Sequence, residues 1–140
     1  MIEMQTKYLL FNGSIVLLVG LLSGVPMGVA IIQKKGESTI HAWRVAHLTL
    51  IMDGLMMIIL GFVAPDLPLS KFAISIFVWA LMISGYGFIF ALTMGASIGH
   101  RGLTPTPYGI NTALYGCHII GALGSLIGVV IFIFGFCKTL

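Results

Sequence analysis

The sequence contains very little charge. Of its 140 residues, Asp and Glu account for four and Lys and Arg for seven, so charged residues make up 8% of the chain. A water-soluble domain needs far more polar surface than this, and here 59% of the residues are hydrophobic. The composition therefore excludes a soluble domain and predicts one integral membrane domain over residues 1–140.

Other absences exclude several classes of function. The basic residues form no run, so the net charge of +3 predicts no nucleic-acid partner, and lipid head groups are the natural partner instead. Cys117 and Cys137 would lie about 30 Å apart on one helix, so they cannot form a disulfide within it. No Ser-His-Asp order, phosphate loop or zinc motif is present. The templates of soluble enzymes therefore do not apply.

Four apolar stretches make up nearly all of the chain. They predict helices at about 9–32, 41–64, 71–98 and 109–136, each long enough to cross a hydrocarbon layer of about 30 Å. The fold class is therefore all-α: a polytopic membrane protein with a four-transmembrane-helix bundle and both termini on the same side. The lysines and arginines divide almost evenly between the two sides, so they do not decide the orientation.

Glycines recur at helical spacing in the first and last stretches. Gly20, Gly24 and Gly28 line one side of the first helix, where small residues let another helix approach closely, and Pro26 predicts a kink near its end. The fourth helix carries a second such surface, made of Gly116, Gly121, Gly124, Ser125 and Gly128. Both patterns predict close helix–helix contacts.

Two ionisable residues in the second helix are the strongest functional candidates. Charge is costly inside a membrane, so His47 and Asp53 are functional candidates by default. A neutral imidazole such as His47 supplies a lone pair for iron, although it could equally bond a neighbouring helix. Asp53 either bonds a neighbouring helix in its protonated form or contacts substrate and carries protons.

Depth along the helices groups further polar residues with these two. His47 and His118 both lie about two turns inside the membrane from the same face, and Tyr86 lies at nearly the depth of Asp53. These depths predict one polar pocket that opens toward that face. The Tyr86 hydroxyl either bonds backbone or acts on a ligand, and His47 and His118 could ligate one haem from both sides.

Two arginines and a histidine would crowd the rim of this pocket. Arg44 and Arg101 are interfacial anchors in the simplest interpretation, and His100 is then an exposed loop histidine. In the more specific interpretation the two guanidinium groups bind carboxylates such as haem propionates, and His100 also contacts a propionate. Both interpretations stay open at the level of the sequence.

The motifs in the second helix and the last loop resemble one family. Trp43, Ala46 and His47, followed by Asp53-Gly54 and methionines, are similar to the second helix of the styrene oxide isomerases. The run 101–104, Arg-Gly-Leu-Thr, resembles that family's loop before the fourth helix. The order, the spacing and the four-span layout all agree.

The resemblance implies a small protein of the bacterial cytoplasmic membrane that forms trimers and holds haem b between subunits. His47 matches the family's axial histidine. In the family, ferric iron acts as a Lewis acid on an epoxide oxygen, and a hydride shift then gives the aldehyde. Two positions depart from the family, which has asparagine at the place of Asp53 and a pocket tyrosine at the place of Leu92.

Our leading prediction is a haem b-dependent epoxide isomerase that acts on a small hydrophobic substrate. His47 binds the iron, and Arg44, Arg101 and His100 hold the cofactor. Asp53 and Tyr86 are the catalytic candidates. The alternatives are a haem protein for electron transfer or sensing, with His118 as the second iron ligand, and a non-catalytic accessory subunit of a larger membrane complex.

Overall fold

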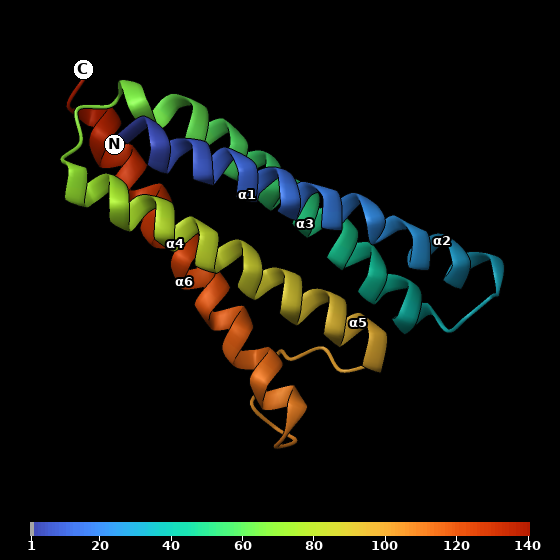
Figure 1. The fold of residues 1–140 in the computed structure, drawn as a ribbon. Helices are drawn as coiled ribbons and strands as arrows, with labels where there is room; N and C mark the ends of the chain where they lie inside the picture. The colour runs from blue at the N-terminus through green and yellow to red at the C-terminus, as the bar shows by residue number, and fades with distance from the viewer. Residues whose placement is uncertain (1) are drawn as a thin grey trace.

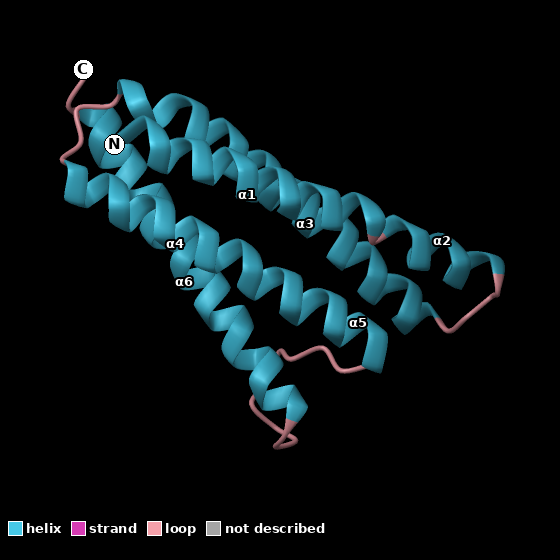
Figure 2. Ribbon diagram, viewed as in Figure 1, coloured by secondary structure: helices cyan, strands magenta, loops and turns pink. Residues whose placement is uncertain are grey.

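The structure is a computed structural model that describes the backbone of residues 2–140 and the side chains of residues 4–140. It is all-helical, and no strand occurs among the described residues (Figure 2). Four helical segments are long and apolar enough to cross a membrane: Met4–Ile32, Glu37–Asp66, Lys71–Ile98 and Ile110–Cys137. The prediction of an all-α protein with four membrane-spanning segments is therefore confirmed. Both ends of the chain lie at one end of the bundle (Figure 1), and their location on the same side of the membrane stays a prediction.

The first segment consists of two helices, α1 (Ile2–Leu22) and α2 (Gly24–Ile32). It begins earlier than the expected position near residue 9, in a stretch where Met4, Gln5 and Lys7 are good helix formers. The interruption at Ser23 follows from Pro26, which has no N–H to donate to the carbonyl of Leu22. The Ser23 hydroxyl instead donates to the carbonyl oxygen of Val19 at 2.8 Å.

The second segment is helix α3 (Glu37–Val63), which ends in a short 3-10 turn, η1 (Ala64–Asp66). Glu37 lies in the first turn of α3, where a negative charge interacts favourably with the positive end of the helix dipole. The helix therefore starts before the expected position near residue 41.

The third segment contains an irregularity that the sequence did not predict. Helix α4 (Lys71–Ile89) continues through a π-helical stretch, η2 (Phe90–Met94), into the short helix α5 (Gly95–Ile98). Gly99 then ends the segment with a φ of 75°, the left-handed conformation that favours glycine. Stretches of π-helix are frequent at functional sites because the extra residue turns side chains onto a new face.

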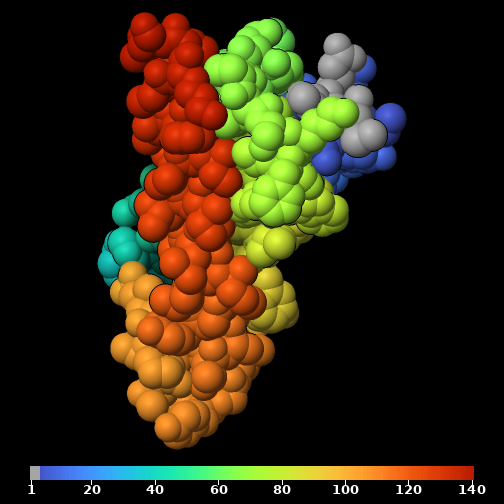
Figure 3. All heavy atoms as spheres, turned by 90° about the vertical axis from the view of Figure 1, so that its left-hand side faces the viewer, coloured from blue at the N-terminus to red at the C-terminus, as the bar shows by residue number. Residues whose placement is uncertain are grey.

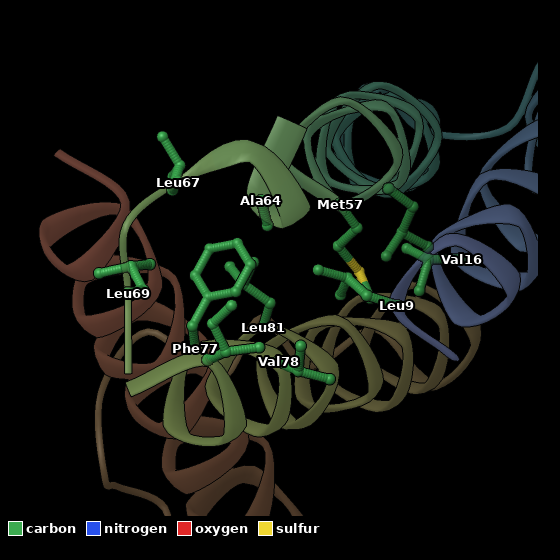
Figure 4. Packing of buried hydrophobic residues seen from close by; sticks show 11 residues of the cluster. Leu9, Val16, Met57, Ala64, Leu67, Leu69, Phe77, Val78 and Leu81 are labelled. Atoms are coloured by element: carbon green, nitrogen blue, oxygen red, sulfur yellow. The ribbon is translucent and has the colours of Figure 1, made fainter. Parts of the chain in front are cut away.

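The fourth segment, α6 (Ile110–Cys137), completes the bundle. Figure 1 shows α1 running along α3 and α4 running along α6, while α3 and α6 diverge at the end away from the termini. The buried core lies near the termini, where Leu9 and Val16 of α1 meet Met57 of α3 and Phe77 of α4 (Figure 4). The buried core therefore holds the helices together at the end of the bundle where the termini lie.

Candidate functional site

The His47 imidazole packs against the junction of α1 and α2. Its Nδ1 lies 2.8 Å from the carbonyl oxygen of Gly20. A carbonyl oxygen only accepts hydrogen bonds, so Nδ1 carries the hydrogen and the neutral ring keeps its lone pair on Nε2. Nε2 has no hydrogen-bond partner among the described residues, and it is not fully buried. Histidines that bind metals commonly use this arrangement, with one nitrogen fixed by a carbonyl and the other free.

Two glycines let α3 approach α1 and α2 closely, and one of them makes room for the His47 ring. A Cβ atom at Gly24 would lie 3.0 Å from His47 Cε1 and 3.1 Å from its Nδ1, and a Cβ atom at Gly20 would lie 2.7 Å from the backbone nitrogen of Ile51. The close contact predicted for Gly20 and Gly24 is therefore present. Gly28 differs, because a Cβ atom there would meet nothing within 4 Å.

We expect Gly24→Ala to disturb the His47 ring and destabilise the fold by about 1–3 kcal/mol, the usual effect of overpacking. Gly28→Ala is the matched control, since it adds the same methyl group to the same helix in open space. Thermal unfolding of the two variants in detergent measures the difference. Equal melting temperatures would show that the packing around His47 is looser than described.

Asp53 is a buried carboxyl group without a partner. Its side chain is 6% exposed and makes no hydrogen bond or ion pair with any described residue. Oδ2 is sealed between α3 and α4, where Gly85 leaves space for it, since a Cβ atom there would lie 3.4 Å away. Oδ1, in contrast, is not fully buried. A buried polar group without a partner costs free energy, so it is retained for a reason other than stability.

Asp53 lines a groove of about 550 Å³ between α3, α4 and α6. We call this space the Asp53 groove; its other lining residues are Leu48, Thr49, Met52, Met56, Phe88 and Ser125. The Ser125 hydroxyl is occupied, because it bonds Ser84 at 2.6 Å while Ser84 donates to the carbonyl of Gly121. The groove is thus apolar except at Asp53 and Thr49. It suits a hydrophobic ligand with one hydrogen-bonding group.

A smaller polar pocket of about 80 Å³ lies nearer the loop between α5 and α6. Its polar lining is His100, Arg101 and His118, and Leu92 of the π-helical stretch contributes apolar lining. The His118 ring lies beside the backbone of Arg101 and 6.3 Å, between centroids, from the ring of Phe88. The structure therefore brings together three of the residues that the sequence singled out.

One asparagine holds the loop that carries this pocket. Asn111 is buried, and its amide nitrogen donates to the carbonyl oxygens of Thr104 and Thr106 at 2.8 and 2.9 Å. Its Oδ1 accepts the backbone N–H of Gly102 at 3.1 Å. All of the side-chain hydrogen bonds of Asn111 thus fix the backbone next to Arg101.

Tyr86 contacts α1 and not the two spaces described above. Its hydroxyl donates to Asn12 Oδ1 on α1 at 2.6 Å, and the Asn12 amide donates to the carbonyl oxygen of Tyr8 at 2.7 Å. Tyr86 lines neither the Asp53 groove nor the polar pocket. Its catalytic role stays a prediction, and the observed contact is one between helices.

Comparison with known protein families shows to which family the chain belongs. Residues 5–137 match the family described as styrene oxide isomerase. The chain belongs to the styrene oxide isomerase family. This membership supports an isomerase function and an integral membrane location. No curated protein and no solved structure gave a significant match.

For a styrene oxide isomerase family member, the positions of the predicted site residues are informative. The single polar pocket expected from helix depth is not formed within one chain. His47 packs on α1 and α2, whereas Asp53 and His118 line the spaces between α3 and α6. Arg44 is exposed on α3, about one turn before His47. Among the described residues no group of three or more His, Cys, Asp or Glu side chains could hold a metal ion.

Sequence reasoning missed several residues of this isomerase family member. Asn12 is a polar residue inside an apolar run, and the rule that singled out His47 and Asp53 would also have found it. Asn111, Ser84 and Phe88 gave no comparable signal, because polar residues at helix ends and aromatic residues in membranes are common. Their roles depend on which neighbours the fold provides.

We expect Tyr86→Phe to weaken the contact between α1 and α4 while leaving turnover unchanged. Hydrogen bonds between membrane helices contribute about 0.6–1.7 kcal/mol, so the melting temperature should fall slightly. Turnover and thermal unfolding of the same preparation measure both effects. A large loss of turnover at unchanged stability would instead assign the hydroxyl to the substrate.

Proposed function

We propose that the protein is a haem b-dependent membrane isomerase that opens an epoxide and yields a carbonyl compound. The observation that carries this proposal is His47, whose Nδ1 is fixed by the Gly20 carbonyl and whose Nε2 is left free. Membership of the styrene oxide isomerase family supports the type of reaction. The location that we propose is the bacterial cytoplasmic membrane.

The donor set around His47 fits one ligand to a haem iron, because the Gly20 carbonyl occupies Nδ1 and Nε2 keeps its lone pair. The hydrogen bond to Gly20 selects the tautomer whose free Nε2 binds iron, and it makes the ring a stronger ligand. When haem b is bound, its ferric iron supplies a Lewis acid for the epoxide oxygen. Arg44, exposed on the same helix about one turn before His47, is placed for a charge-assisted hydrogen bond with a propionate.

The two sides of α3 carry different parts of the proposed site. His47 faces α1 and α2, and the Asp53 groove faces α4 and α6. A site with both residues is therefore incomplete in one chain and requires a neighbouring copy, which supports the homotrimer implied by the family. Arg101 and His100 would reach the propionates of a haem on His47 only from such a neighbour.

Asp53 is the residue that we assign to the substrate. Its open oxygen is positioned to hydrogen-bond the oxygen of an epoxide, and in its neutral form the carboxyl group donates this bond. The methionines and Phe88 along the groove exclude water, so that water does not compete for the opening ring. The reaction breaks one C–O bond and moves a hydride to the neighbouring carbon, so no oxidant or reductant is consumed.

Conversion of styrene oxide to phenylacetaldehyde tests this function. The purified protein loaded with ferric haem should catalyse the conversion, and the same protein without haem should not. A haem-loaded preparation that leaves styrene oxide and other hydrophobic epoxides unchanged would contradict the proposal.

A further inference from the structure

The polar pocket and the Asp53 groove follow one another along α3, and a contact between two aromatic rings joins their linings. The Phe88 ring lines the groove and lies against His118, which lines the pocket. A Cβ atom at Gly121 would lie 2.8 Å from the Phe88 ring, so this glycine gives the ring its place. One stripe of α3 lines both spaces, with Val45 in the pocket and Met52 and Asp53 in the groove. We call the combined space the α3–α6 trough.

The two ends of the trough differ in chemistry. At the loop end, Arg101 and His100 provide donors for an anion, and no Asp or Glu lines that pocket. In the surface view of Figure 3, the loop before α6 (orange) forms the lower end of the molecule, and the teal segment that includes the start of α3 lies above it at the left edge. At the inner end, Asp53 faces a space that is otherwise almost entirely apolar. The trough thus complements a ligand with an acidic head, an apolar chain and an oxygen atom farther along.

The separation of the two ends sets the length of this ligand. Val45 and Asp53 are eight residues apart on α3, which corresponds to about 12 Å along the helix. An extended carbon chain zigzags, so each bond of about 1.5 Å advances the chain by only about 1.25 Å, and roughly ten bonds span this distance. A pocket of about 80 Å³ has room for a carboxylate group, since water occupies about 30 Å³ per molecule.

We propose that the α3–α6 trough selects epoxides carried on a long apolar chain that ends in a carboxylate. The carboxylate binds Arg101 and His100, and the epoxide oxygen lies at Asp53. The identity of the reacting group rests on the proposed function, whereas binding of the carboxylate does not. A guanidinium group forms the strongest such contacts because it donates two parallel hydrogen bonds.

The kinetic test compares a long-chain epoxy acid, with about ten carbons between the carboxylate and the epoxide, with its methyl ester. Hydrogen bonds to a charged group contribute about 1.5–3 kcal/mol, so kcat/KM should favour the acid by about 10- to 100-fold. Arg101→Gln should abolish this preference, and Lys34→Gln should keep it, because Lys34 lies in the α2–α3 turn outside the trough. Equal values of kcat/KM for acid and ester in the wild type would overturn the proposal.

A binding test separates this proposal from the isomerase function. Stearic acid, which has no epoxide, should raise the melting temperature of the purified protein in phosphatidylcholine nanodiscs, and methyl stearate should not. Arg101→Gln should remove the stabilisation and Lys34→Gln should retain it, whether or not any epoxide is converted. If Arg101→Gln lowers the haem content instead and leaves stearic acid binding unchanged, the pocket holds propionates of a neighbouring copy and the proposal is wrong.

Discussion

His47→Ala is expected to give a folded membrane protein that purifies without haem. The substitution removes the nitrogen that we assign to iron, together with a hydrogen bond that holds α1 near α3. The ratio of Soret absorbance to protein measures the outcome, and it should fall to the background level. Turnover of styrene oxide should be lost in parallel, because the Lewis acid is no longer held.

His118→Ala is the matched control for this prediction, since it removes an imidazole from another transmembrane helix. His118 lies beside Arg101 and Phe88, away from the face of α3 that carries His47. The haem content should therefore be retained in His118→Ala. Loss of haem in both variants would favour a haem held by two histidines. Retention of haem in both would show that His47 does not bind it.

Asp53→Leu is expected to raise stability and to reduce turnover strongly. The buried carboxyl group has no partner, and such a group costs about 1–3 kcal/mol, which an apolar side chain of similar size recovers. Removal of a hydrogen bond to the reacting oxygen costs roughly 100-fold or more in kcat. Thermal unfolding and turnover of haem-loaded protein give the two readouts.

A conservative variant distinguishes hydrogen bonding from charge at this position. Asp53→Asn keeps a hydrogen-bond donor of the same shape, so it should retain much of the turnover that Asp53→Leu loses. If Asp53→Leu is destabilised and fully active, Asp53 supports the packing of α3 on α4 and does not contact the substrate.

The sequence was sufficient to predict the class of fold. Low charge and four long apolar stretches require a helical bundle in a membrane, because every backbone polar group there must be paired internally. The same reasoning singled out His47 and Asp53, since unpaired ionisable groups are rare in such surroundings. The glycine spacing also predicted that another helix packs closely against Gly20 and Gly24, and the structure shows that this helix is α3.

The grouping of the site residues was less predictable because depth alone does not determine direction. His47 and Asp53 differ by six residues, or about 1.7 helical turns, so their side chains leave α3 on different faces. The π-helical stretch then changes the register of the third span, which determines that Leu92 lines the polar pocket. The bond from Tyr86 to Asn12 joins residues far apart in the sequence and required the packed structure.

The central claim is that Nε2 of His47, which bonds no described residue, would hold a haem iron that supplies a Lewis acid to the substrate. The absorption spectrum of the purified ferric protein, recorded before and after the addition of imidazole, tests it most directly. We predict a Soret band that shifts when imidazole binds the open position. A preparation without a Soret band would contradict the claim, and a band that does not respond to imidazole would show that the iron has no open position.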